Sequence, residues 1–530
     1  MRRWNGWGDD THDYPLPESA AARLETWVGA GQRPSDATLD DVLQTVPPSR
    51  LRPHPLVNDM ADARVRHARG QSFPDWVALR YGRIPTFPDG VALPTTDDDV
   101  RDLLRYARQT GTRLIPYGGG TSVVGHINAA PGDAPALTVN MQRMKLLLAL
   151  DETSHLATFA AGVQGPDLEA QLRAHGYTLG HFPQSFELST LGGWVATRSS
   201  GQQSLGYGRI EALFAGGVLE SPAGTLTLPP HPASAAGPDL RQLVLGSEGR
   251  MGIITAATVR ISPLPEREDF HAVFFPDFAS GQTAARQILQ ARIPLSMLRL
   301  STAVETATTL ALAGRERLIG ALEGLLALRG VGEGKCMLLF GVTGSQALTK
   351  MARAATLDIT GRHGGVHVGR AFGKQWHKGR FHTPYLRNAL WERGYGVDTL
   401  ETAVTWDKVP QTLENIEAAL HHALAELGEK VHVFTHLSHM YTDGASIYTT
   451  YLFRLAATAD ETLRRWQQMK DAASRVIVQQ GGTISHQHGV GTDHAPYLAA
   501  EKGELGMAAL RGVFREFDPE GLMNPGKLVA

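Results

Sequence analysis

The sequence predicts an α+β fold built from two main domains. Up to residue 265, short runs of β-branched residues alternate with amphipathic stretches, as strands and helices do in α+β domains. After residues 263–265 (PLP) the helical stretches become longer, which indicates a second domain. A chain of 530 residues is long enough for this division, because single cores stop growing at roughly 250–300 residues.

The predicted elements follow in order. Residues 1–84 are expected to form a helical extension, with helices near 39–43 and 61–67. In residues 94–107 a capping hydroxyl and an acidic first turn precede apolar residues on one helical face, and a strand follows before Gly118. The stretch from Pro166 to His175 is amphipathic as well. Later strands are expected at 272–275, 336–342 and 446–452.

One predicted helix carries Leu318, Ile319, Leu322, Leu325 and Leu326 on a single broad apolar face. Such a face usually packs in a core. A tunnel-lining or membrane-facing helix is the alternative.

Composition argues against several classes of function. The 51 basic and 53 acidic residues leave no net charge that would attract nucleic acid. The single cysteine, Cys336, can form no intramolecular disulfide or cysteine cluster, and we expect a buried structural thiol. We find no apolar signal region, no apolar run of about 18 residues and no C-terminal peroxisomal address. We therefore expect a cytoplasmic protein, or one attached peripherally to a membrane.

Three glycine-rich segments follow one another at intervals that suit one nucleotide site. They are 113–125 (RLIPYGGGTSVVG), 187–201 (ELSTLGGWVATRSSG) and 245–254 (LGSEGRMGII). Glycines let a backbone approach a pyrophosphate, and amide and hydroxyl groups can donate to its oxygens. Neither a G-x-G-x-x-G fingerprint nor a G-x-x-x-x-G-K-[ST] loop is present, so we expect several loops to hold the ligand.

In these three segments the chain resembles flavoproteins of the vanillyl-alcohol-oxidase (PCMH) type. The resemblance implies a PCMH-type FAD-binding domain at 85–265, an α+β substrate (cap) domain at 266–490, and a helical tail at 491–530 that returns to the FAD-binding domain. We expect the FAD to be non-covalent, although His126 lies near the first loop. The resemblance also implies a set of cofactor-binding residues in the three segments. They are Pro116, Tyr117, Gly118, Gly119, Gly120, Thr121, Ser122, Ser189, Thr190, Gly192, Gly193, Trp194, Thr197, Ser199, Glu248, Gly252, Ile253 and Ile254.

Over nearly its whole length the chain is also similar to the alkyldihydroxyacetonephosphate synthases, or alkylglycerone-phosphate synthases. The similarity rests on 4–8 (WNGWG), 394–402 (GYGVDTLET), 444–448 (GASIY) and 485–491 (SHQHGVG). Such enzymes exchange the acyl chain of acyl-dihydroxyacetone phosphate for a fatty alcohol through a flavin N5 adduct, in ether-lipid synthesis. A homodimer and peripheral contact with a membrane are expected as well.

The same similarity implies roles for individual residues. Arg387 would bind the substrate phosphate, since a guanidinium is planar and always charged. Tyr448 would remove a proton, which requires neighbours that favour the phenolate because a phenol has a pKa near 10. His486 and His488 would assist Tyr448 or bind the oxygen that gains charge during the reaction. Arg299 would lie near the flavin, and His436 would bind the substrate.

Position 487 departs from the family, which has three consecutive histidines where this chain reads His486, Gln487 and His488. Glutamine can donate and accept hydrogen bonds but cannot take up a proton. His436 or His439 could replace the missing imidazole.

Three alternatives remain open. An FAD-linked D-2-hydroxyacid dehydrogenase or oxidase would share the architecture and the tail at 518–527 (DPEGLMNPGK), but residues 442–448 (TDGASIY) lack the histidine and asparagine of its usual G-D-G-N-x-H segment. A zinc site of His436, His439, His486 and His488 has only weak support from spacing, and our prediction contains no metal. A lipid carrier with a structural flavin would not need a base beside an anion-binding residue.

Overall fold

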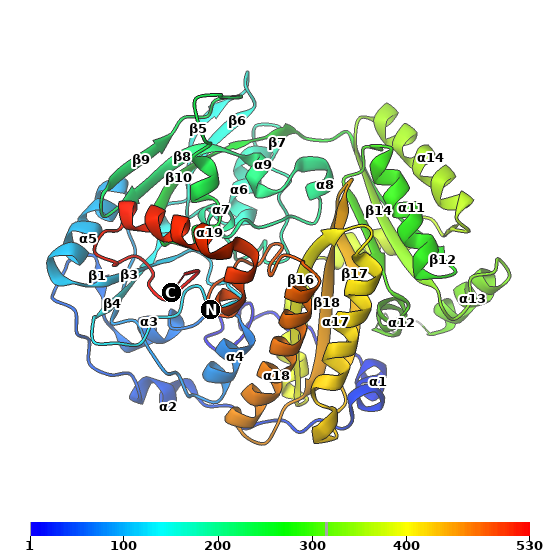
Figure 1. Cartoon of the computed structure of the whole chain (residues 1–530), viewed down its shortest axis with the longest axis horizontal. Coiled ribbons are helices and arrows are strands. Elements are labelled where there is room, and N and C mark those ends of the chain that lie inside the picture. The colour runs from blue at the N-terminus through cyan, green and yellow to red at the C-terminus, as the bar shows by residue number, and fades with distance from the viewer. Residues whose placement is uncertain (1, 313–315, 530) are drawn as a thin grey trace.

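The computed structural model describes residues 2–312 and 316–529, and three β-sheets with surrounding helices form its framework (Figure 1). The first sheet has the order β1 (Val57–Asn58), β2 (Gly90–Ala92), β4 (Ala136–Asn140), β3 (Arg113–Tyr117), with the last three strands parallel. The second is antiparallel, in the order β5 (Leu147–Asp151), β6 (Leu156–Ala160), β10 (Ile253–Arg260), β8 (Phe214–Ser221), β9 (Gly224–Leu228). A small pair, β7 (Tyr177–Thr178) and β11 (Ser262–Pro263), lies beside it.

The helix expected within residues 94–107 is α5 (Asp97–Thr110). Thr96 and Asp99 form a reciprocal capping box at its start, and Gly111 ends it in the left-handed conformation with φ of 70°. β3 follows and ends at Tyr117, directly before the first glycine segment. The amphipathic stretch at 166–175 forms α6 (Gly165–Arg173) up to Arg173, and the second glycine segment contains α7 (Leu191–Thr197).

A seven-stranded antiparallel sheet forms the second half of the molecule. Its order is β15 (Val366–His367), β12 (Arg267–Phe275), β14 (Cys336–Gly344), β13 (Met297–Ser301), β17 (His432–Met440), β18 (Gly444–Arg454), β16 (Tyr395–Thr405). The strands expected at 272–275, 336–342 and 446–452 lie in β12, β14 and β18. Cys336, at the start of β14, is buried.

Two layers of helices cover this sheet, because its strands alternate their side chains between both faces. On β12, Val273 and Phe275 pack with one layer, while Phe270 and Phe274 pack with the other. The first layer contains α11 (Phe278–Gln290), α14 (Gln346–Arg362) and α17 (Val409–Ala423). The second contains α12 (Ala303–Leu312), α13 (Glu316–Ala327) and α15 (Ala371–Gly379).

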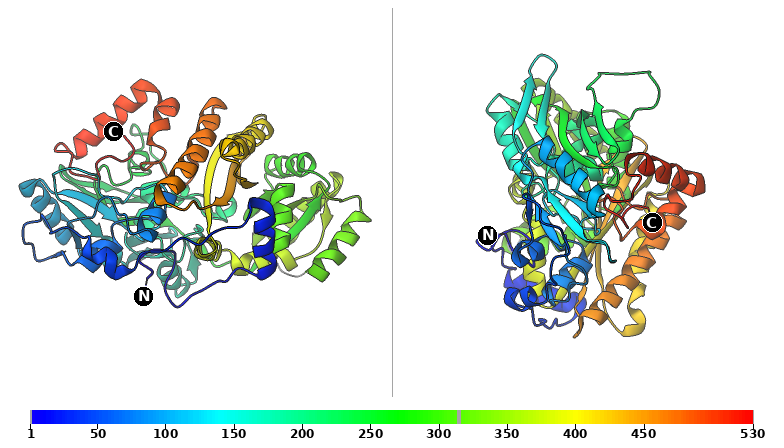
Figure 2. Two further views of the ribbon diagram at one scale, coloured as in Figure 1. Left: turned by 90° about the horizontal axis from the view of Figure 1, so that it is seen from below. Right: turned by 90° about the vertical axis from the view of Figure 1, so that its left-hand side faces the viewer.

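The N-terminal part of the chain runs along the underside of the molecule, from the first sheet to α1 (Glu18–Val28), which lies beside α12 (Figure 2). Three helices complete this extension: α2 (Leu39–Gln44), α3 (Ala61–Arg66) and α4 (Phe73–Arg80). Its helices therefore touch both halves of the molecule, since α4 also packs against α18 (Ala459–Gln479).

The C-terminal part crosses back to the first sheet after α19 (Ala495–Phe517). Leu114 of β3 donates its N–H to Leu522 O at 2.9 Å and accepts from Asn524 N at 2.8 Å, so the tail extends this sheet at its edge. Further short α-helices are α8 (Ser204–Tyr207), α9 (Ile210–Leu213), α10 (Arg241–Val244) and α16 (Leu386–Glu392). The domain boundaries at residues 84, 265 and 490 stay predictions. Each helix in the described ranges is too short or too polar to cross a bilayer.

Candidate active site

A cavity of about 1040 Å³ lies between the glycine segments and the seven-stranded sheet. Every residue predicted to bind the cofactor lines it. Arg299, Arg387, His436, Tyr448 and His488 line it as well, whereas His486 does not. The structure therefore brings together residues that are far apart in the sequence, in one space large enough for a dinucleotide and a second ligand.

The glycines of the first segment allow the second segment to approach. A Cβ atom on Gly119 would lie 1.8 Å from the carbonyl oxygen of Leu188, and one on Gly118 would lie 2.2 Å from the hydroxyl of Thr190. The amide N–H groups of residues 119–122 make no hydrogen bond within the described chain. A row of available donors on a tightly packed loop fits a pyrophosphate.

Glu248 of the third segment holds the tail in place. Its carboxylate accepts from Val490 N at 2.6 Å and from Gly491 N at 2.8 Å, and its backbone oxygen accepts from the Asn524 side chain at 2.8 Å. His126 is engaged nearby, with Nδ1 2.8 Å from the Ser122 hydroxyl and Nε2 3.2 Å from the Glu248 carboxylate. The tail thus closes one side of the cavity.

Tyr448 lies on β18 directly opposite His436 on β17, and the two rings stack with 4.9 Å between their centroids. His488 meets Tyr448 edge-on at 5.9 Å. Burial raises the pKa of the Tyr448 phenol well above its usual range, and a hydrogen bond with Thr399 offsets only part of this effect. In the ligand-free protein the neighbours therefore do not favour the phenolate, contrary to the requirement that sequence analysis set for this residue.

Arg299, which is half-buried, forms a cluster with two buried residues, Glu305 of α12 and His436. The Glu305 carboxylate accepts from Arg299 at 2.5 Å and lies 3.0 Å from His436 Nδ1. Burial alone would raise the pKa of Glu305, but His436 and Arg299 outweigh it and lower this pKa to about 2. The carboxylate is therefore charged, and it fixes both side chains at the cavity wall.

Arg387, the second residue of α16, rests over the Trp76 ring at 4.5 Å and donates to Gln71 O at 2.6 Å. Burial is the main cause that lowers the pKa of this guanidinium. Within the described ranges it makes no ion pair with a carboxylate. A guanidinium that is held by stacking, with donors to spare, can receive an anionic ligand.

Glu401 of β16 lies at the centre of the histidine segment. Its carboxylate accepts from Gln487 N at 2.6 Å and from His488 N at 3.0 Å, and it lies 3.5 Å from His488 Nδ1. Burial would raise the pKa of Glu401, but other interactions, of which that with His488 is the largest, outweigh burial and hold this pKa well below its usual range. The carboxylate is thus a buried negative charge beside His488.

His486 lies behind the cavity wall. Its Nε2 atom is 2.6 Å from an Arg209 N–H and 2.6 Å from the Tyr441 hydroxyl. Since a guanidinium can only donate, Nε2 is the acceptor and the imidazole is neutral. Burial is the first cause that lowers the pKa of His486. This side chain is held by Arg209 rather than exposed to a ligand.

A β-bulge brings His439 into the cavity wall. On β17 the residues His432, Phe434, His436 and Ser438 line the cavity at every second position, so position 439 would face away in a regular strand. The pairing slips between Ser438 and Met440, and His439 takes a φ of 47°. Its Nδ1 atom lies 3.1 Å from the hydroxyls of both Ser200 and Ser204.

Sequence reasoning missed Glu305, Glu401 and Arg209 as parts of the site. Glu401 lies in the segment 394–402, on which the similarity to the synthases partly rests, and this position could have identified it as a site residue. Nothing local marks Glu305 or Arg209. Of the four histidines that were considered for zinc, none joins a group of three or more potential ligands within the described residues.

Comparisons with known proteins cover both halves of the chain. Residues 88–227 match the family described as "FAD binding domain", and residues 264–528 match "FAD linked oxidases, C-terminal domain". The latter match takes in half of the 530 residues. These two families confirm FAD as the cofactor and confirm the predicted fold class.

Individual proteins that are similar to this chain are more specific than the two families. An alkyldihydroxyacetonephosphate synthase of Dictyostelium discoideum is 28% identical, over 99% of this chain and 93% of its own. A solved alkyldihydroxyacetonephosphate synthase is 27% identical, with a TM-score of 0.85 over 99% of this chain and 98% of the other. A mitochondrial D-lactate dehydrogenase (cytochrome) of Arabidopsis thaliana is 25% identical, over 88% of this chain and 77% of its own.

Proposed function

The chain belongs to the FAD-linked oxidases and is an FAD-dependent enzyme, and from this premise we propose that it exchanges the acyl chain of acyl-dihydroxyacetone phosphate for a fatty alcohol. The observation that carries the proposal is the joint presence of Arg387, Tyr448 and His488 in the wall that faces the FAD-binding segments. An anion-binding group beside a proton-transfer pair suits a phosphate-bearing ketone substrate.

The three glycine segments would hold FAD, with amide donors of residues 119–122 on its pyrophosphate. The chemistry that bound FAD supplies to this exchange is that of a temporary covalent acceptor, with no net oxidation. We propose that FAD is not covalently linked, because both ring nitrogens of His126 lie close to Ser122 and Glu248. Acid precipitation should leave the yellow colour in the supernatant, whereas a yellow pellet would contradict this.

Arg387 would bind the substrate phosphate. Stacking on Trp76 and the bond to Gln71 O fix the guanidinium, so little freedom is lost when a ligand binds. The substrate carbon that loses a proton would then lie near Tyr448, in the same cavity.

Proton transfer would involve Tyr448 and His488 together. The raised pKa of Tyr448 makes the phenol a poor base unless another group takes its proton. His488 meets the Tyr448 ring edge-on, and its own ring lies 3.5 Å from the Glu401 carboxylate. The negative charge of Glu401 stabilises the imidazolium that forms, so His488 can accept the proton while Tyr448 acts on the substrate.

The apolar part of the cavity would hold the acyl and alkyl chains. It is lined from α12, α13 and α16 by Leu312, Leu318, Ile319, Leu322, Leu386 and Leu390. These six side chains are apolar, so a hydrocarbon chain would bury its surface against them.

One experiment separates this function from D-2-hydroxyacid oxidation. The purified holoprotein is mixed with acyl-dihydroxyacetone phosphate, and the flavin absorbance and free fatty acid are followed. We expect bleaching with release of fatty acid, and ether product after a fatty alcohol is added. Bleaching by a D-2-hydroxyacid, followed by recovery with an electron acceptor, would instead establish the dehydrogenase that the Arabidopsis relative represents.

We further propose a homodimer in the cytoplasm that touches a membrane through α13. Leu318 lines the cavity and is 66% exposed, while Leu325 and Leu328 are 51% and 86% exposed. Such a helix can contact both lipid and substrate. Co-sedimentation with phospholipid vesicles should fall when Leu325 and Leu328 are replaced by serine, and light scattering would give the mass of the assembly.

A further inference from the structure

The N-terminal segment 2–9, here called the strap, is fixed to the helix that carries Arg387. Asn388 is the residue after Arg387 on α16. Its side chain accepts from Trp7 N at 3.2 Å and donates to Trp7 O at 3.0 Å. Both backbone groups of Trp7 are thereby paired with one side chain, which sets the position of Trp7 relative to Arg387.

The glycines of the WNGWG sequence allow this contact. Gly8 has a φ of 81°, and a Cβ there would lie 2.2 Å from the Tyr385 ring. A Cβ on Gly6 would lie 2.6 Å from the Asn388 side chain. The conformation and close packing of the strap thus require glycine at both positions, and the sequence is suited to docking on Tyr385 and Asn388.

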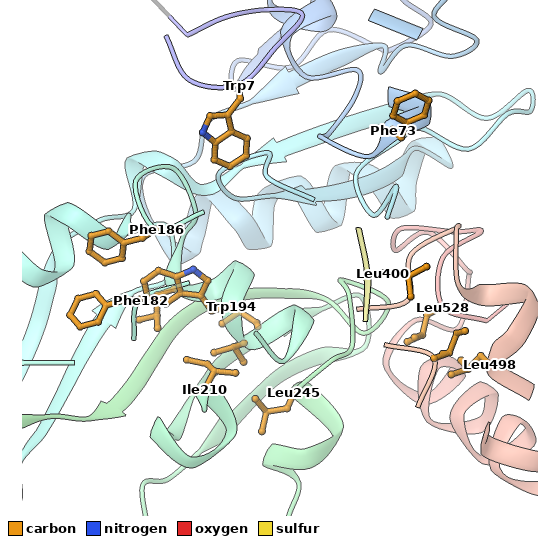
Figure 3. Close-up of a cluster of buried hydrophobic side chains, with 14 of the residues drawn as sticks. Trp7, Phe73, Phe182, Phe186, Trp194, Ile210, Leu245, Leu400, Leu498 and Leu528 are labelled. Atoms are coloured by element: carbon orange, nitrogen blue, oxygen red, sulfur yellow. The ribbon is translucent and has the colours of Figure 1, made fainter. Parts of the chain in front are cut away.

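The Trp7 side chain has a donor without a partner. The residue is 4% exposed and lines the cavity, and its indole Nε1 is buried with no hydrogen-bond partner among the described residues. Figure 3 shows the ring projecting from the N-terminal segment. Buried donors are nearly always paired, and an indole N–H can only donate. No group among the described residues supplies the missing partner.

Gln71 connects the strap with the anion-binding arginine. Its backbone oxygen accepts from Arg387 at 2.6 Å, and its side chain donates to Gly6 O at 3.4 Å. Its own N–H donates to Ser122 O at 2.6 Å, in the first glycine segment. Trp7 is thus placed where the Arg387 region and the first glycine segment meet, and both of these suit phosphate oxygens.

We propose that the Trp7 indole N–H donates a hydrogen bond to a phosphate oxygen of a bound ligand. This inference deepens the proposed function and rests on it for the identity of one ligand. Two phosphates could supply the oxygen: the phosphate monoester of the substrate beside Arg387, or the pyrophosphate of FAD beside the glycine segment.

The test compares Trp7→Phe with Trp4→Phe, which makes the same change within the strap at a residue that does not line the cavity. Calorimetry gives two dissociation constants for each protein, that of dihydroxyacetone phosphate for the holoprotein and that of FAD for the apoprotein. Loss of a hydrogen bond to a charged group should weaken the relevant affinity about tenfold or more. Trp4→Phe should match the wild type in both.

The two dissociation constants distinguish which ligand supplies the phosphate. A weaker affinity for dihydroxyacetone phosphate alone assigns the substrate phosphate, and a weaker affinity for FAD alone assigns the pyrophosphate. Wild-type values for both would overturn the inference. These readouts do not depend on turnover, so the inference can hold even if the exchange reaction is not found.

A second variant is available if Trp7→Phe does not fold. Asn388→Ala keeps the indole but releases both backbone groups of Trp7, and Asn388 itself does not line the cavity. The same affinity should then fall, while unchanged values for both ligands would overturn the inference. Unphosphorylated dihydroxyacetone serves as the control ligand, since its binding should not respond to either substitution.

Discussion

At the scale of single residues, burial sets the protonation state of the groups around the cavity. Tyr448 is neutral because burial raises its pKa, whereas Glu401 and Glu305 are charged because basic neighbours outweigh the same effect. Tyr448 therefore contacts two histidine rings, His436 and His488, and each of these lies next to a charged carboxylate. This arrangement lets a proton move to an imidazole without creating an unpaired buried charge.

Replacing Tyr448 by phenylalanine removes the hydroxyl that we propose as the base. We expect the variant to bind FAD with its normal absorbance, because the cofactor segments lie elsewhere, and to lose exchange activity about 10²–10⁴-fold. Activity is measured as fatty acid release and ether formation. Substantial residual turnover would remove Tyr448 from the role of base.

Replacing Arg387 by alanine should weaken the binding of phosphate-bearing substrate more than the binding of FAD. A charge-assisted hydrogen bond contributes about 1.5–3 kcal/mol, so KM should rise at least tenfold. Arg387→Lys keeps the charge but loses the planar contact with Trp76, and it should recover only part of the affinity. Equal losses for FAD and substrate would show that Arg387 is mainly structural.

At the scale of elements, close contacts between loops build the cofactor site. Gly119 meets the backbone of Leu188, so its replacement by alanine forces the first two glycine segments apart. We expect Gly119→Ala to lose most of its FAD and to unfold at a lower temperature, as measured by FAD content and thermal melting. Gly320→Ala is the matched control, since nothing lies within 4 Å of its Cβ on α13 and alanine favours helix. A Gly119→Ala protein with full FAD content would contradict the packing argument.

The contact between β16 and the histidine segment should depend on pH. The pKa of Glu401 is lower in the folded protein than its ordinary value of 4.5, so its stabilising effect is complete above that pH and declines as the pH falls below it. Glu401→Gln should destabilise the protein by about 3–5 kcal/mol at pH 7, because it removes one partner of a buried charged group. Chemical denaturation of both proteins would show the difference shrinking below about pH 4.5. A constant difference would contradict the assignment.

Local patterns in the sequence predicted those elements whose causes are local. The first helix of the cofactor half follows from Thr96, its acidic first turn and its apolar spacing. The place of His439 could not be predicted, because a bulge overrides the alternation of a strand. Arg209 could not be predicted either, because its partner His486 lies 277 residues away. Residues that act through distant contacts leave no local pattern.

At the scale of the whole molecule, the two ends of the chain meet the cavity from different sides. The strap docks on α16, while the tail pairs with β3 and is held by Glu248. Binding of cofactor and substrate should therefore stabilise both the strap and the tail, which lie at opposite ends of the sequence. Helix α19 lies over the cofactor half, and α18, which it contacts, lies beside α17 of the cap (Figure 1).

Releasing the tail should open the site. Asn524 donates to His126 O at 3.0 Å and to Glu248 O at 2.8 Å, and both bonds are lost in Asn524→Ala. We expect weaker FAD binding and faster proteolysis in residues 518–529, with excess FAD restoring protection because a ligand stabilises the form that binds it. Unchanged proteolysis with full FAD content would show that the tail is held by other contacts.

The slip in pairing between Ser438 and Met440 has a consequence for the history of such proteins. Because the slip lies one pair before the turn that joins β17 to β18, deleting the codon of His439 would remove an imidazole from the cavity wall and leave the other strand pairs in register. Descendants of one ancestor could thus diverge in chemistry through a gap of one position, a change that substitution counts would overlook.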